Sequence, residues 1–251
     1  MRSAWLLSLV WLAPLVAAET PSVAETAYAR GDFVGAAAAW TEEMRGEGVT
    51  AGRLAALGNA EWRLGRKGRA MVCWERALRL DPWDPVALAG IRHAQGAGGV
   101  DRPAATWPEA YASVLPPEGW WLLGLAAFWT ALLCVVVPRW RGVTAGEANH
   151  RARLGALTLL GLCLPGIWGG RSLDERAVIR RTEVSLRLTP TRFGEPLSGL
   201  DEGDVVRVDR PLNGHVRVIT AEGKTGWVRA GELERVRGEG PPADLDQTAT
   251  P

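Results

Sequence analysis

The spacing of hydrophobic and polar residues changes several times along this chain of 251 residues. Residues 20–96 have apolar positions at helical spacing, two long uncharged runs follow, and residues 176–237 alternate with a period of two. A period near 3.6 is typical of helices that bury one face, and a period of two is typical of strands. The sequence therefore predicts a multidomain fold: an all-α part, two transmembrane helices and an all-β part at the C-terminus.

Residues 20–96 contain an internal repeat. Similar residues recur at one constant spacing, namely Gly31 and Gly65, Tyr28 and Trp62, Ala36 and Ala70, and Trp40 and Trp74. A small residue one turn before an aromatic residue on the same helix face lets a second helix approach, and the ring fills the space beside it. This pattern predicts two helical hairpins and a capping helix, with Trp40 and Trp74 in the core.

Two runs without a charged residue, 119–138 and 154–170, are long enough to cross a membrane as helices. The second run is the shorter one and contains a proline, so a re-entrant or buried helix is an alternative for it. The intervening loop, 139–153, carries four arginines and one glutamate, and short positive loops stay in the cytoplasm. Residues 97–118 contain several glycines and prolines and are expected to be a linker.

Residues 1–18 predict an export signal. Arg2 precedes an apolar stretch, and small residues at positions 17 and 18 suit cleavage. An uncleaved N-terminal anchor is the alternative. In both cases the chain that follows is exported, so the repeats and the C-terminal part are expected on the same extracytoplasmic side.

Within residues 176–237, strands are expected at 184–188, 204–208, 216–219 and 226–228, with turn residues between them. Four or five strands in about 60 residues close as a small barrel. This part has two aromatic residues, Phe193 and Trp227, so it poorly supplies the adjacent rings on which a proline-rich peptide or a sugar docks. Residues 238–251 are polar and are expected to be a disordered tail.

Composition and motifs narrow the classes of function. There are 29 Lys and Arg residues and 28 Asp and Glu residues, and a net charge of +1 gives no electrostatic reason to bind nucleic acid. The three cysteines lack metal-ligand spacing, and neither a nucleophile elbow nor a phosphate-binding loop occurs. The protein is therefore expected to have no catalytic site and no cofactor or metal.

Two stretches resemble known repeats and modules. Residues 57–85 resemble the tetratricopeptide (TPR) repeat in Leu57-Gly58-Asn59-Ala60, Leu64-Gly65, Ala70, Trp74, Ala77 and Pro82, but Glu61 stands where that family usually has an aromatic residue. Residues 184–228 resemble the bacterial SH3 (SH3b) module, most specifically in residues 223–228, although an aromatic residue usual near His215 is missing. The order of signal, TPR repeats, membrane hairpin and SH3b module resembles BatE-type proteins of the Bat (aerotolerance) gene clusters.

The TPR resemblance implies a concave groove that binds a peptide, and the groove residues would be Glu25, Tyr28, Asn59, Trp62, Arg63 and His93. For Tyr28 and Trp62, packing between helices is an equal alternative. The BatE resemblance implies partners among other Bat proteins, von Willebrand A-domain (VWA) membrane proteins and a MoxR-type AAA+ ATPase. The expected function is a protein–protein scaffold anchored in the bacterial cytoplasmic membrane, and binding or sensing of peptidoglycan through the SH3b module is the alternative.

Overall fold

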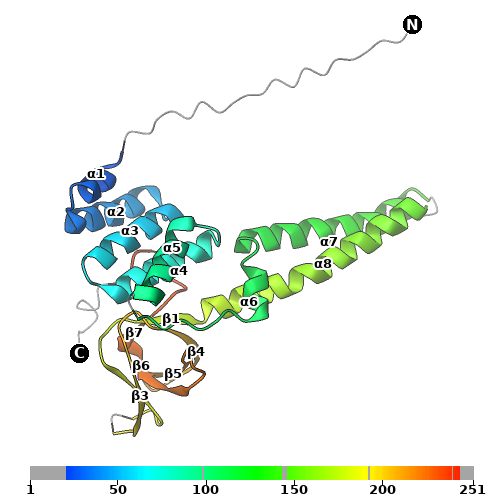
Figure 1. The fold of residues 1–251 in the computed structure, drawn as a ribbon. Helices are drawn as coiled ribbons and strands as arrows, with labels where there is room; N and C mark the ends of the chain where they lie inside the picture. The colour runs from blue at the N-terminus through cyan, green and yellow to red at the C-terminus, as the bar shows by residue number, and fades with distance from the viewer. Residues whose placement is uncertain (1–20, 98, 143–145, 192, 239, 244–251) are drawn as a thin grey trace.

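The computed structural model describes residues 21–97, 99–142, 146–191, 193–238 and 240–243. Within these residues the chain forms eight α-helices and one antiparallel sheet of seven strands. Five helices gather near the N-terminus, and two long helices project together as a hairpin (Figure 1). The sheet lies beside the five-helix part and the end of the hairpin from which the two long helices project. The sequence predicted this order of helical part, apolar hairpin and β part, and the structure confirms it. The predicted export signal lies outside the described residues.

The helical part contains α1 (Val23–Ala29), α2 (Phe33–Glu47), α3 (Ala51–Arg63), α4 (Lys67–Leu80) and α5 (Pro85–Ala97). Four of these helices are capped at their starts by a side-chain oxygen that accepts a hydrogen bond from a backbone N–H group of the first turn. The capping residues are Ser22, Asp32, Thr50 and Asp84. The sequence repeat has a structural counterpart in the turns after α1 and α3. There Gly31 and Gly65 have φ angles of 81° and 78°, a left-handed conformation that favours glycine.

The two repeated tryptophans lie in the core, as the sequence predicted. Trp40 is 5% exposed and Trp74 is 1% exposed. A β-carbon on Gly58 of α3 or Gly90 of α5 would lie 2.5 or 2.3 Å from the nearest atom of the Trp74 ring. Three helices therefore pack around one indole, which is possible only because the facing positions have no side chain.

The projecting hairpin consists of α7 (Pro117–Trp140) and α8 (Glu147–Asp174). Both helices are long and apolar enough to cross a membrane, and 22% of the apolar stretch of each is buried within the molecule. They pack where side chains are small, since Gly166 lies against Trp120 and Gly124 lies near Cys163. The predicted loop 139–153 is shorter in the structure, because α7 continues to residue 140 and α8 begins at residue 147.

The structure corrects the predicted linker, residues 97–118. Trp107–Ala112 form a helix, α6, and α7 already begins at Pro117. Pro108, Glu109 and Ala112 of α6 are buried, and the Tyr111 hydroxyl donates a hydrogen bond of 2.9 Å to the Leu162 carbonyl of α8. The glycine and proline content of these residues is typical of a linker. Composition alone does not indicate that a segment is buried against residues that are distant in the chain.

α8 and α6 approach each other closely at Gly169, because a β-carbon there would lie 1.9 Å from the Pro108 carbonyl oxygen. We expect Gly169→Ala to destabilise the protein by about 1–3 kcal/mol through overpacking. Gly161→Ala, at a position on α8 with open space around it, should be neutral or stabilise by up to about 1 kcal/mol. Thermal unfolding of the full chain in detergent, followed by circular dichroism, measures both. Equal effects of the two substitutions would contradict the packing of α6 on α8.

The sheet is built from β1 (Arg176–Ile179), β2 (Val184–Arg187), β3 (Pro196–Leu200), β4 (Val205–Leu212), β5 (His215–Ile219), β6 (Thr225–Arg229) and β7 (Leu233–Arg235), with a short 3-10 helix, η1 (Ala230–Glu232), before the last strand. The strand order is β3-β2-β6-β5-β4-β1-β7. Every strand contributes to one apolar core, and the sheet curls around it (Figure 1). The four predicted strands correspond to β2, β4, β5 and β6, whereas the sequence did not mark β1, β3 and β7.

Strand β1 shows why some strands were missed. All four of its residues are buried: Ala177 and Ile179 belong to the core of the sheet, and Val178 belongs to the core of the helical part. Val205 of β4 joins the helical core in the same way. A strand that is covered on both faces shows no alternation of polar and apolar residues. The helical part and the sheet therefore share a continuous interior.

The predicted disordered tail, 238–251, is described only at residues 238 and 240–243. Here the structure differs from the prediction. Arg76 of α4 donates a hydrogen bond of 2.8 Å to the Gly240 carbonyl, and Arg180 donates one of 3.2 Å to the Ala243 carbonyl. The described start of the tail therefore packs against α4 and the residue that follows β1.

Candidate functional site

The predicted groove residues on α3 and α5 lie together. The rings of Trp62 and His93 are in edge contact, with centroids 5.6 Å apart. Trp62 is half-buried and His93 is exposed. Asn59 lies one turn before Arg63 on α3, is half-buried, and its side-chain amide has no hydrogen-bond partner among the described residues. We call Asn59, Trp62 and His93 the α3–α5 cluster.

The Trp62 side chain packs on the core and remains partly accessible. Its ring centroid lies 5.7 Å from that of the buried Trp74, so one part of the side chain packs on the core. The remaining part is accessible beside His93. A tryptophan held in this way presents apolar area without losing side-chain entropy on binding, which is a property of binding hot spots.

The other three groove residues have local contacts. The Glu25 carboxylate accepts the Ser22 backbone N–H at 3.0 Å and completes the cap of α1. The Tyr28 ring packs against Phe33 and Trp40, with centroids 5.2 and 5.7 Å away. The Arg63 guanidinium lies 5.5 Å from the centroid of the Phe33 ring, in cation–π geometry. Glu25 and Tyr28 therefore stabilise the fold through these contacts. Arg63 is exposed and connects α3 to Phe33 of α2.

Charged residues that the sequence did not single out meet between the helices and the sheet. We call Glu75, Arg102, Glu109, Arg176 and Arg207 the junction cluster. Arg176 Nη2 donates to Glu109 at 2.9 Å, and Arg207 Nη2 donates to the same carboxylate at 3.0 Å. Arg102 donates to Glu75, and Arg176 Nη1 lies 3.8 Å from Glu75. The cluster thus connects α4, α6, β1 and β4.

The carboxylates of the junction cluster are ionised despite their burial. Burial acts to raise the pKa of Glu75, but the Arg102 and Arg176 guanidinium groups outweigh it and hold that pKa below its ordinary value. Burial is likewise outweighed at Glu109 by the Thr106 backbone N–H, Arg176 and Arg207, and its pKa is also lowered. Charged carboxylates that already hold guanidinium groups do not exchange protons near neutral pH. The junction cluster therefore connects the helical part to the sheet through charged groups that are paired with one another.

Further ion pairs attach α4 to its neighbours. Arg76 pairs with Glu234 of β7 at 2.8 Å, and Arg79 pairs with Asp174 at the end of α8 at 2.7 Å. The backbone N–H of Gly68 donates to Glu202 at 2.9 Å. Because α4 also packs against α3 and α5, the α3–α5 cluster is connected through one helix to the hairpin and the sheet.

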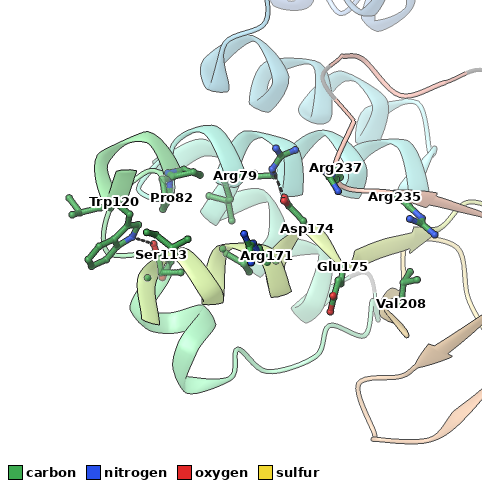
Figure 2. A pocket seen from close by; sticks show the side chains of 18 of the residues that line it. Arg79, Pro82, Ser113, Trp120, Arg171, Asp174, Glu175, Val208, Arg235 and Arg237 are labelled. Atoms are coloured by element: carbon green, nitrogen blue, oxygen red, sulfur yellow. Dashed lines mark hydrogen bonds and ion pairs between the residues drawn. The ribbon is translucent and has the colours of Figure 1, made fainter. Parts of the chain in front are cut away.

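A cavity of about 570 Å³ lies where α4, α6, α7 and α8 meet β4 and β7. Figure 2 shows Trp120 of α7, Arg79 of α4, Arg171 of α8, and Arg235 and Arg237 at the end of the sheet around it. It is lined by both apolar and charged side chains. The sequence did not predict this cavity, because its walls come from six separate elements.

No group of three or more His, Cys, Asp or Glu residues is placed to hold a metal ion within the described parts of the chain. Cys73 is buried in the helical core, and burial, with the nearby Glu61, raises the pKa of its thiol to about 12. Compared with known proteins, the chain matches no family model and no curated protein.

Proposed function

We propose that this protein is a non-catalytic scaffold anchored in a bacterial cytoplasmic membrane. In this proposal α7 and α8 span the membrane, the TPR-like helical part and the SH3b-like sheet face the extracytoplasmic side, and the helical part binds another membrane or periplasmic protein. The length and apolar character of α7 and α8 support insertion. The arginine-rich connection between them and the N-terminal export signal support this sidedness.

The α3–α5 cluster is the observation that carries the binding proposal. It combines an aromatic ring that is fixed on the core, an amide with free hydrogen-bonding capacity and an exposed imidazole on two neighbouring helices. Buried or half-buried tryptophan at a protein surface, surrounded by polar groups, is the composition of interface hot spots. A peptide or helix of a partner would place an apolar side chain on Trp62 and a backbone or polar group at Asn59.

The junction cluster supports a scaffold more than a flexible tether. The ion pairs of α4 and the shared core of β1 hold the helical part against the sheet and the end of α8. A partner bound at the α3–α5 cluster would therefore lie at a fixed height and orientation over the membrane. The resemblance to BatE-type proteins makes VWA-domain membrane proteins and a MoxR-type ATPase complex the first partners to test.

Binding or sensing of peptidoglycan through the sheet is the second candidate, and one observation favours it. Phe193 is 98% exposed between β2 and β3, which suits contact with a sugar or peptide. The second aromatic residue of this part, Trp227, is buried at 9% exposure. A platform of one ring is weaker support than the α3–α5 cluster, because ligand grooves of this kind use several adjacent rings.

Replacing Asn59, Trp62 and His93 together by alanine should reduce co-purification of membrane partners at least about tenfold, since hot-spot residues each contribute roughly 2 kcal/mol or more. The measurement is crosslinking and pull-down of the full chain from membranes, with quantification of the captured proteins. Trp83→Ala is the matched control, because Trp83 is a tryptophan of the same helical part that is 66% exposed. Equal recovery of partners by the wild type, the triple variant and Trp83→Ala would contradict the proposed groove.

The second candidate is tested by sedimentation of the full chain with peptidoglycan. Sedimentation of the wild type that is lost in the Phe193→Ala variant would support binding through the sheet.

A further inference from the structure

The cavity at the base of the hairpin has an apolar and a charged lining. Leu115, Trp120, Trp121 and Ile167 contribute apolar surface from the start of α7 and the adjoining turn of α8. Guanidinium groups from α4, α8 and the end of the sheet contribute the charged surface (Figure 2). Its volume of about 570 Å³ falls in the range of roughly 300–1,000 Å³ that is common for small-molecule sites. This lining suits an amphipathic ligand with one charged end.

Some of the charges in the cavity are already paired within the protein. Arg79 pairs with Asp174 at 2.7 Å (Figure 2). The Asp209 carboxylate of the lining pairs with Arg217 of β5, which lies outside the lining, at 3.0 Å. Arg79, Asp174 and Asp209 are therefore neutralised by their partners and do not determine the sign of charge that a ligand should carry.

The remaining charges are predominantly positive. The side chains of Arg171, Arg235 and Arg237 have no hydrogen bond or ion pair with any described residue. Glu175 is the carboxylate of the lining that likewise has no partner among the described residues. Three free guanidinium groups against one carboxylate favour an anionic ligand, and the planar guanidinium group matches the oxygens of a phosphate.

The position of the cavity along the hairpin identifies the level at which such a ligand would lie. Arg171 is the first charged residue after the uncharged run 154–170 of α8. Trp107, Trp121 and Trp168 are 68%, 60% and 61% exposed near this end of the hairpin. Exposed tryptophans gather where the hydrocarbon of a membrane meets the headgroups. With α7 and α8 in a membrane, the cavity lies at the level of the lipid phosphates.

We propose that this cavity binds the phosphate of an anionic phospholipid headgroup, with Arg171, Arg235 and Arg237 around the phosphate oxygens and Trp120 and Trp121 beside the glycerol and acyl chains. An anionic lipid is favoured over a zwitterionic one, because three arginines face a single free carboxylate. The inference rests on insertion of α7 and α8, which is part of the proposed function, and it does not depend on the α3–α5 cluster. A bound lipid would bridge α8 and the end of the sheet at the membrane surface.

The test uses the full chain purified in a mild detergent and stripped of lipid. Phosphatidylglycerol, phosphatidylcholine or inorganic phosphate is added, and retention is measured by native mass spectrometry together with the midpoint of thermal unfolding. The wild type should retain phosphatidylglycerol in preference to phosphatidylcholine and gain thermal stability from it. The variant R171Q/R235Q/R237Q should bind phosphatidylglycerol at least about tenfold more weakly, because it removes the charge-assisted hydrogen bonds to the phosphate oxygens. All three arginines are exposed, so folding should be preserved.

The matched control is R30Q/R92Q/R181Q, which removes the same charge from exposed arginines outside both the cavity and the hairpin. It should bind phosphatidylglycerol as the wild type does. Equal loss in both variants, or no preference for phosphatidylglycerol, would overturn the site. Stabilisation by inorganic phosphate that equals that by phosphatidylglycerol would show a phosphate site and not a lipid site. Membrane insertion is tested separately: release of the protein from membranes by alkaline carbonate would show that α7 and α8 are not inserted.

Discussion

Glu109→Ala should destabilise the protein by about 3–5 kcal/mol, because it leaves Arg176 charged, buried and without its principal partner. Arg176 is 1% exposed, its Nη2 donates to Glu109 at 2.9 Å, and Glu109 also holds Arg207. The Arg176 guanidinium would retain Glu75 at 3.8 Å as its nearest carboxylate. The expected result is a large decrease in the midpoint of thermal unfolding of the full chain in detergent.

Glu222→Ala is the control for this prediction. Glu222 pairs with Lys224 at 2.6 Å, but both side chains are more than half exposed, and such surface pairs contribute about 0–1 kcal/mol. The comparison therefore separates loss of a buried partner from loss of a charge. If both variants lost the same stability, the junction cluster would not connect the helical part to the sheet.

The pH dependence of stability provides a second readout for Glu109. Its folded pKa lies below the ordinary value, so its stabilising contribution is present above the unfolded pKa of about 4.3 and is lost as the pH falls through the folded pKa. Burial raises the pKa of Asp204, so Asp204 changes the pH dependence of stability in the opposite direction. It does so equally in the wild type and in Glu109→Gln and does not affect their comparison. The wild type should therefore lose more stability than Glu109→Gln when the pH is lowered below about 5.

Trp74→Ala should cost about 3–5 kcal/mol, because it empties the centre of the helical part. The ring is 1% exposed, lies against Gly58 and Gly90, and donates a hydrogen bond of 3.3 Å to the Ala55 carbonyl. Facing glycines have no side chains that could move into the space. The ring of Trp62 rests on Trp74, so partner binding at the α3–α5 cluster should decrease as well.

Trp83→Ala controls for the loss of a tryptophan from the same part of the chain. Its indole is 66% exposed and donates one hydrogen bond of 3.2 Å to the Val114 carbonyl, which is consistent with a cost of about 1 kcal/mol. Chemical denaturation of both variants, followed by circular dichroism, measures the difference. A cost for Trp74→Ala as small as that for Trp83→Ala would contradict its central position.

The proposed binding surface and the proposed lipid site lie on parts of the protein that α4 connects. At one side α4 packs with α3 and α5 around Trp74, and at the other it reaches Asp174 of α8 through Arg79. In the proposed function, these contacts of α4 would hold the binding surface at a fixed position relative to the hairpin. Disruption of the junction cluster should therefore weaken partner assembly without touching the α3–α5 cluster.

The sequence alone determined the features that depend on neighbouring residues. Helical spacing with glycine turns located the α-hairpins, the length of the uncharged runs located α7 and α8, and alternation located β2, β4, β5 and β6. Each of these signals is local, since periodicity and run length follow from the geometry of one element. The core positions of Trp40 and Trp74 followed from their repetition beside small residues.

Tertiary structure decided the features that join distant residues. Glu75, Glu109 and Arg176 lie far apart in the chain, and opposite charges that pair across such separations leave no periodic pattern in the sequence. The same reason applies to α6, which is held by α8 and the junction cluster, and to β1, which loses its alternation because both faces are covered. The cavity at the base of the hairpin, with its arginines from α8 and the end of the sheet, exists only once these elements have packed together.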